Sequence, residues 1–249
     1  MTLAAFDLSI LGPAFAAGLL VAATHVPLGA QVLARGIVFI DLAIAQIAGC
    51  GVLMAARMGL EADGAAVQVA AFTAALGGAL LLTWTERVWP DVQEAVIGVT
   101  FVLAATGGVL LLASDPHGNE HLRDLLVGQI LWAQPSRLGW AAAVYAVVLA
   151  SWFGLGERLG RVGFYAIFAL AVTVSVQLVG LYLVFATLIV PPLATRRMRS
   201  RRLAAAWIIA AAGYALGLAI STATDLPSGP VIVWAMCALG LAWFFIIRR

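Results

Sequence analysis

Residues 163–195 read GFYAIFALAVTVSVQLVGLYLVFATLIVPPLAT and contain no charged side chain. A helix needs about 20 apolar residues to cross the roughly 30 Å of hydrocarbon in a bilayer, so this run is too long for a single span. Gly180 stands near its middle and Pro191-Pro192 near its end, and both residue types interrupt helices. We therefore predict two shorter membrane helices, 163–178 and 180–195.

The rest of the chain has the same apolar character. Of its 249 residues, 63% are hydrophobic and 10% are charged, whereas soluble domains carry about 25% charged residues. The sequence predicts an all-α, polytopic transmembrane helical bundle of nine spans, with eight as the alternative, and leaves no room for a separate soluble domain within residues 1–249. The remaining spans are expected at 10–33, 38–57, 65–88, 93–113, 136–153, 202–222 and 230–247.

The sequence contains no lysine, and all of its basic residues are arginine. A Walker A phosphate-binding loop requires a lysine, so any ATP that drives this protein must be hydrolysed by another chain, and we expect no enzymatic activity. The net charge of +2 and the lack of a basic stripe argue against a nucleic-acid partner. Cys50 and Cys237 lie in apolar runs and are expected to act as small hydrophobic residues. The first residues lack the basic region of a cleavable signal peptide.

The arginines predict the orientation of the chain, because basic residues gather in cytoplasmic loops. The densest cluster of arginines consists of Arg196, Arg197, Arg199, Arg201 and Arg202. If this cluster is cytoplasmic, then eleven of the 14 arginines are cytoplasmic and the N-terminus of a nine-span chain is outside. The loop 154–162 is then cytoplasmic and the loop 114–124 faces outward.

Four polar residues inside or at the start of predicted spans are candidates for a translocation path, because such residues are costly in lipid and usually face a cavity or a partner. His25 lies two residues before Pro27, and Asp41 shares a helix face with Ala45, with Gln46 close beside them. We expect His25, Asp41 and Gln46 to line a path for a cation. Asp41 could instead lie at the interface or pair with Arg35. Glu94 is a weaker candidate, because it could simply cap its helix.

The predicted outer loop carries a second candidate site, residues 116–121, which read PHGNEH. His117, Glu120 and His121 have the ligand types of zinc or manganese. The alternative is a polar loop whose histidines only contact water, or an outer gate held by hydrogen bonds. A zinc hydrolase with an inverted motif would need a buried helix and a third ligand. Pro116 and Gly118 argue against that reading.

Four segments resemble the permease subunits of bacterial zinc and manganese ABC importers, and the resemblance extends over nearly the whole chain. The first segment, residues 27–48, contains FIDLAIAQ at 39–46. The second is QEAVIG (93–98), the third is PHGNEH (116–121) running into LLVGQIL (125–131), and the fourth is QLVGLYLVFATLIVPP (177–192). The first segment differs from the common form of the family at one position. Where the family commonly has Asp-x-x-x-His, Ala45 takes the place of the histidine. The sequence is therefore closer to a subgroup with Asp-Leu-Ala-Leu-Ala-Gln and a His-Gly-x-Glu-His outer loop.

The resemblance implies a fold similar to that of the type II, vitamin B12-type importer permeases and a single permease domain over 1–249. It implies a homodimer, or occasionally a heterodimer, in the bacterial inner membrane, surrounded by lipid. A cytoplasmic ATP-binding subunit would dock near Trp152–Phe164, and a periplasmic metal-binding protein would deliver the ion. No covalently bound cofactor is expected. The transported ion would be zinc first and manganese next, with ATP bound to the partner subunit. A proton-coupled metal transporter and a permease for a metal chelate are the alternative functions.

Overall fold

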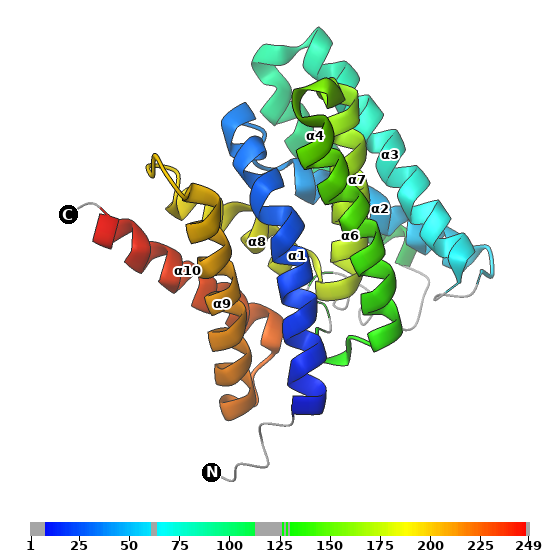
Figure 1. Cartoon of the computed structure of the whole chain (residues 1–249). Helices are drawn as coiled ribbons and strands as arrows, with labels where there is room; N and C mark the ends of the chain where they lie inside the picture. The colour runs from blue at the N-terminus through cyan, green and yellow to red at the C-terminus, as the bar shows by residue number, and fades with distance from the viewer. Residues whose placement is uncertain (1–7, 61–63, 113–125, 127, 129, 248–249) are drawn as a thin grey trace. The chain divides into compact units, whose positions relative to one another are not determined.

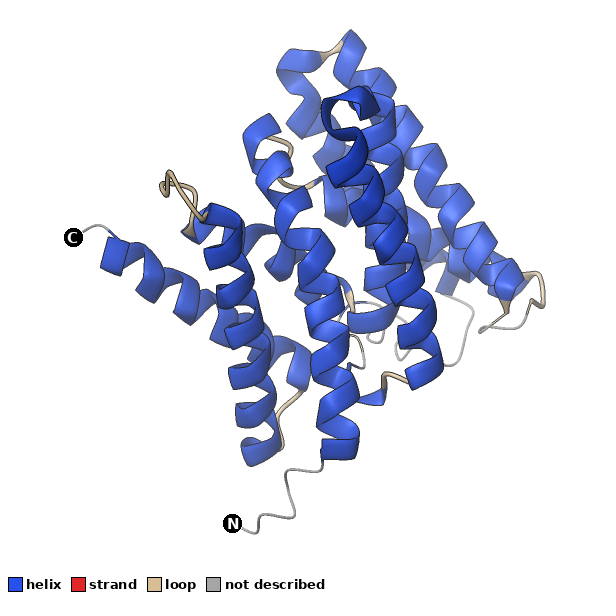
Figure 2. Cartoon of the chain, in the orientation of Figure 1, coloured by secondary structure: helices blue, strands red, loops and turns tan. Residues whose placement is uncertain are grey.

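The computed structural model describes residues 8–60, 64–112, 126, 128 and 130–247, and all regular structure in these residues is helical (Figures 1 and 2). Three short 3₁₀ helices, η2 (Pro90–Val92), η3 (Ile130–Trp132) and η4 (Gly156–Leu159), accompany the α-helices. The α-helices are α1 (Leu8–Arg35), α2 (Ile40–Arg57), α3 (Ala65–Val88), α4 (Gln93–Leu112), α6 (Pro135–Leu155), α7 (Gly160–Val179), α8 (Leu181–Ala194), α9 (Arg202–Thr224) and α10 (Ser228–Ile247).

The predicted all-α membrane fold is confirmed, and each predicted span corresponds to one helix. Within the described ranges, eight helices are long and apolar enough to cross a membrane. The ninth, α8, has only 14 residues, or about 21 Å at 1.5 Å per residue, which is less than the hydrocarbon thickness. The structure therefore agrees with eight full spans and one short apolar helix.

The break between α7 and α8 lies at Gly180, as the sequence predicted. Gly180 has φ 85°, a left-handed conformation that favours glycine. Gly128 lies against the same break: a Cβ atom on Gly128 would be 2.2 Å from the backbone oxygen of Val179. The backbone at Gly128 therefore packs directly against the backbone at Val179 and Gly180, about 50 residues further along the chain.

The chain forms two compact units, each built from separate stretches of sequence. The first unit, called unit 1 below, contains 1–35, 126–146 and 177–249, and the second, unit 2, contains 36–125 and 147–176. In unit 1, α1 packs on α8 and α9, and α10 packs on the same two helices. In unit 2, α2 packs on α3 and α4.

Glycines allow the helices of unit 1 to approach closely. A Cβ atom on Gly29 of α1 would lie 1.8 Å from the backbone oxygen of Leu188 in α8, and one on Gly217 of α9 would lie 2.4 Å from Cα of Ile232 in α10. Such contacts of backbone on backbone are typical of membrane helices, where association depends on close van der Waals packing.

Candidate functional site

The N-terminus of α2 is held by a carboxylate from another helix. The residue before α2 is Phe39, whose side chain has no hydrogen-bond acceptor, and its backbone N–H donates to Oε1 of Glu94 at 3.3 Å. Glu94 belongs to the first turn of α4. A carboxylate at this position satisfies a backbone donor that the helix itself leaves without a partner, and it interacts favourably with the positive end of the helix dipole.

The neighbouring residue, Gln93, fixes the place where Glu94 begins α4. The buried side chain of Gln93 donates from Nε2 to the backbone oxygen of Leu82 at 3.0 Å and accepts at Oε1 from the Thr85 hydroxyl at 3.0 Å. Leu82 and Thr85 both belong to the last two turns of α3. This amide therefore joins the end of α3 to the start of α4 and positions Glu94 beside α2.

Asp41 adds a second carboxylate to the same helix end. It lies in the first turn of α2 and is fully buried. Neither of its oxygens has a hydrogen-bond partner among the described residues, although the N–H groups of Asp41 and Leu42 lie near the carboxylate. Oε2 of Glu94 is also buried without a partner there. This helix end thus carries three buried carboxylate oxygens without a hydrogen-bond partner among the described residues, an arrangement that suits a cation.

Gln46 does not share the position of Asp41. Five residues at 100° each place Gln46 about 140° around α2 from Asp41, whereas Ala45 lies about 40° away. Gln46 is half-buried and Ala45 is buried. The helix alone therefore does not bring Gln46 and Asp41 together.

His25 lies in α1, within unit 1, and its ring is fully buried. Its Nδ1 is 3.1 Å from the backbone oxygen of Val21 and 3.0 Å from the Thr24 hydroxyl oxygen, and the Thr24 hydroxyl also donates to Val21. A carbonyl oxygen only accepts, so the contact with Val21 favours the tautomer with the proton on Nδ1. In that tautomer Nε2 offers a lone pair, and Nε2 has no partner in the described part of the chain. Metal-binding histidines typically have this arrangement.

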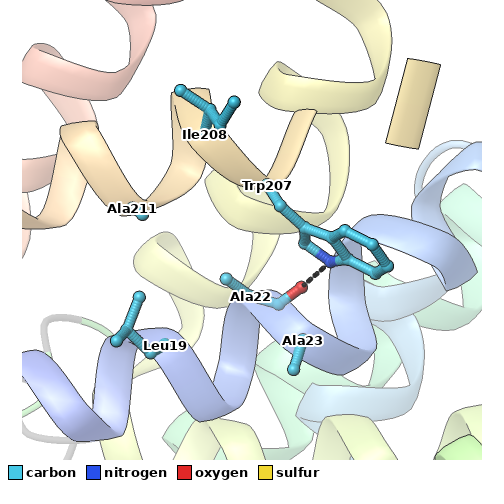
Figure 3. A pocket seen from close by; sticks show the side chains of 6 residues that line it. All are labelled: Leu19, Ala22, Ala23, Trp207, Ile208 and Ala211. Carbon is cyan, nitrogen blue, oxygen red and sulfur yellow. Dashed lines mark hydrogen bonds between the residues drawn. The ribbon is translucent and has the colours of Figure 1, made fainter. Parts of the chain in front are cut away.

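A hydrogen bond from another helix, α9, also stabilises the turn of α1 next to His25. Pro27 provides no backbone N–H and disturbs the preceding turn of α1. The indole Nε1 of Trp207 in α9 donates to the backbone oxygen of Ala22 at 3.2 Å, as Figure 3 shows. Trp207 also lines an open pocket of about 340 Å³ together with Leu19, Ala22, Ala23, Ile208 and Ala211. The indole therefore joins α9 to the turn of α1 next to His25.

The candidate residues divide among three parts of the chain. His25 belongs to unit 1, and Asp41, Gln46 and Glu94 belong to unit 2. His117, Glu120 and His121 lie outside the described residues. In the described ranges, no group of three or more His, Cys, Asp or Glu side chains could hold a metal ion.

Sequence reasoning missed the residues that position these side chains. Gln93 and Trp207 were not among the candidates, although each makes the hydrogen bond that fixes a candidate's helix. A buried amide directly before Glu94 was a visible signal, because glutamine within an apolar span needs partners. For Trp207, the sequence contained no comparable signal.

Two solved structures have a similar fold. PsaBC from Streptococcus pneumoniae, solved in complex with a Fab, matches with a TM-score of 0.78 at 20% identity, over 95% of this chain and 91% of that chain. An inward-facing transporter, provisionally assigned to the metal-chelate type of ABC transporter, matches with a TM-score of 0.68 at 14% identity, over 94% of this chain and 85% of that one. These likenesses establish the fold of an ABC transporter permease.

A sequence profile provides the family. The profile described as the ABC 3 transport family matches residues 7–159 and 148–247, which together cover nearly the whole chain. No curated protein matches the chain at a significant level. A permease of this kind is a membrane subunit that is not itself catalytic and that works with ATP-binding and substrate-binding partners. The chain belongs to the ABC 3 transport family.

Proposed function

We propose that this chain forms the transmembrane path of an importer that moves a divalent metal ion across the bacterial inner membrane, zinc first and manganese next. ATP hydrolysis by partner subunits would drive the transport. The observation that carries the proposal is the group of three buried carboxylate oxygens at the N-terminus of α2, two from Asp41 and one from Glu94, for which the described part of the chain supplies no hydrogen-bond partner. Leaving such groups buried costs free energy, and a passing cation would offset that cost.

The ligand types support a divalent metal. Carboxylate oxygen and imidazole nitrogen bind zinc and manganese, and imidazole favours zinc. The described residues offer few such ligands in one place. A transport path benefits from this arrangement, because an ion that is bound by many ligands leaves slowly.

The transport cycle we propose is alternating access between two copies of the chain, each a single permease domain of residues 1–249. ATP binding by the partners closes the cytoplasmic side and opens the path outward. A metal released by the periplasmic binding protein meets His117, Glu120 and His121, passes His25 and Asp41, and leaves on ADP release. Gln46 has a weaker role in this scheme, because α2 turns it away from Asp41.

The turn between α6 and α7 is the proposed docking site for the ATP-binding subunit. It consists of η4, and Trp152 and Phe164 contact each other on its two sides with ring centroids 5.9 Å apart. Three large apolar side chains at this turn are exposed, namely Phe153, Leu155 and Val162. A packed aromatic pair beside exposed apolar residues is suited to contact a partner protein.

Transport by the reconstituted complex tests the proposal. The chain would be placed in vesicles with its ATP-binding and metal-binding partners, and uptake of zinc and manganese would be measured with and without ATP. Asp41→Asn keeps the shape of the side chain but removes the charge, and we expect it to lower uptake by at least about tenfold. Glu94→Gln should lower uptake less, because Glu94 is only half-buried.

The matched control is Asp91→Asn, which removes an exposed acid three residues before Glu94. It should leave uptake unchanged. Uptake that ignores ATP and follows a pH gradient would instead indicate a proton-coupled transporter. Full uptake by Asp41→Asn would contradict the proposed role of the carboxylates.

A permease for a metal chelate is the second candidate, because one similar fold belongs to a transporter provisionally assigned to that type. A competition experiment distinguishes transport of a bare metal ion from transport of a metal chelate. An excess of a tight chelator should stop uptake of the bare ion but should leave uptake of a chelate intact.

A further inference from the structure

A groove between α8 and α10 has the features of a lipid site. Its volume is about 410 Å³, within the range of small-molecule sites. Both helices are apolar, and α10 is long enough to span a bilayer. The groove is lined mainly by hydrophobic side chains, with one guanidinium among them. Its lining includes Val190, Leu193, Arg196, Cys237, Leu241 and Phe244.

The arginine loop that follows α8 gives this groove a charged end. Arg196 lines the groove itself, two residues after α8 ends. The guanidinium of Arg197 lies over the ring of Phe244, 5.3 Å from its centroid, and Phe244 also lines the groove. Two arginines therefore lie at the end of the groove where α8 finishes.

The stretch of sequence that carries this loop and the groove is almost free of acidic residues. Residues 158–224 and 226–249 contain no aspartate or glutamate. Asp225 lies at the opposite end of α9 from the arginine loop, about 33 Å away at 1.5 Å per residue. An external anion would therefore find a site rich in positive charge beside an apolar groove.

We propose that the α8–α10 groove binds an anionic phospholipid, with its phosphate at Arg196 and Arg197 and one acyl chain along Val190 and Cys237. Guanidinium groups bind phosphate through paired hydrogen bonds, and basic pockets between membrane helices commonly hold anionic headgroups. This inference goes beyond the proposed transport function and does not depend on which ion is carried.

Other occupants fit the groove less well. Free phosphate would leave the apolar part unfilled. A soluble partner could reach the arginines but not Cys237, which lies within the membrane span of α10. A two-fold dimer through this face would bring two identical arginine loops together, which is electrostatically unfavourable.

Cys237 supplies a native probe for the test. The chain has two cysteines, so a Cys50→Ser variant leaves Cys237 as the only thiol. The full chain would be purified in detergent, and the alkylation rate of Cys237 would be measured while phosphatidylglycerol or phosphatidylcholine is added. We expect phosphatidylglycerol to protect Cys237 at lower concentration than phosphatidylcholine does. Arg196→Gln with Arg197→Gln should raise the protecting concentration of phosphatidylglycerol roughly tenfold or more.

The matched control removes two arginines of the same loop that do not line the groove. Arg199→Gln with Arg201→Asn, in which asparagine tolerates the left-handed backbone of residue 201, should leave protection unchanged. Equal protection by both lipids would overturn the proposal, as would equal loss in both double variants. Protection that rises with protein concentration in the absence of lipid would assign the groove to a second copy of the chain and would also overturn it.

A second measurement covers the case in which the arginine variant does not fold. Cys237→Trp fills the apolar part of the groove without changing charge. Native mass spectrometry should then show one fewer phosphatidylglycerol retained per chain than in the wild type. Unchanged lipid retention would contradict the proposal.

Discussion

The two units of the chain differ in both charge and packing. Unit 1 holds nine of the 14 arginines and two of the 12 acids, whereas unit 2 holds the other five arginines and ten acids. Glycines lie against backbone in both units, and the tightest such contact is in unit 1: a Cβ atom on Gly29 would be 1.8 Å from the backbone oxygen of Leu188, whereas one on Gly51 in unit 2 would be 2.8 Å from that of Ala70. The tightest glycine contact and most of the basic charge thus belong to unit 1, and the carboxylates that suit a cation belong to unit 2.

This difference suggests a division of roles. A unit with tightly packed helices and an arginine loop is suited to a fixed position in the bilayer. A unit with acidic residues at helix ends is suited to contact a cation. Substitutions in the two units test this division.

Gly29→Ala should have the largest effect on stability. Its Cβ atom would lie 1.8 Å from the backbone oxygen of Leu188, which cannot move without displacing α8. We expect a loss of at least about 3 kcal/mol and little folded protein. Thermal unfolding in detergent, followed by size-exclusion chromatography, measures the effect.

Two alanine controls sharpen the comparison. Gly78→Ala in unit 2 should cost less, because the Ile47 methyl group 2.5 Å away can rotate. Gly77→Ala, where nothing lies within 4 Å, should be neutral or stabilising by up to about 1 kcal/mol. If Gly29→Ala unfolded at the same temperature as Gly78→Ala, the proposed difference in packing would be wrong.

Glu94→Ala should lower stability moderately, because the backbone N–H of Phe39 loses its acceptor. A lost helix cap costs about 1 kcal/mol. Glu94→Gln keeps an oxygen at the same place and should retain most of that stability while losing the charge. The pair separates the structural role of Glu94 from its proposed role in transport, through unfolding temperature and metal uptake measured on the same samples.

Trp207→Phe should lower stability by about 1 kcal/mol, because a smaller aromatic ring remains but the hydrogen bond to Ala22 is lost. Trp234→Phe is the matched control, since the Trp234 side chain is 79% exposed. If transport also falls in Trp207→Phe, the turn that holds His25 contributes to the path. Equal unfolding temperatures for the two variants would show that this hydrogen bond contributes nothing.

Cys50→Ser should have the smallest effect. The thiol donates to the backbone oxygen of Ala104 at 3.1 Å, and a serine hydroxyl can donate to the same oxygen. We expect a change within about 0.5 kcal/mol in thermal unfolding. A larger loss would mean that the α2–α4 contact depends on sulfur packing.

The helices of this fold could be predicted from the sequence because their ends are marked by charge, glycine and proline. The arginine loop after α8 and the glycine at 180 fixed the boundaries of two helices to within a few residues. Contacts between helices were harder to predict. Spans of this kind are apolar on every side, so their periodicity does not reveal which face packs.

The candidate site shows the same limit. Asp41 and His25 could be identified as candidates from the sequence because each is an ionisable residue inside an apolar span. Such a residue is costly in lipid on any face of the helix, so it usually faces a cavity or a partner. The hydrogen bond from Phe39 to Glu94 joins residues 55 positions apart, and the packing of α2 on α4 alone brings them together. No local pattern could have predicted it.

The break at Gly180 also has an electrostatic consequence. The last carbonyl groups of α7 and the first N–H groups of α8 face a chain interruption inside an apolar segment, so each helix end presents roughly half an elementary charge. Backbone dipoles of this kind carry no titratable proton. The field they set up therefore stays constant across the pH range in which carboxylates and imidazoles change their charge.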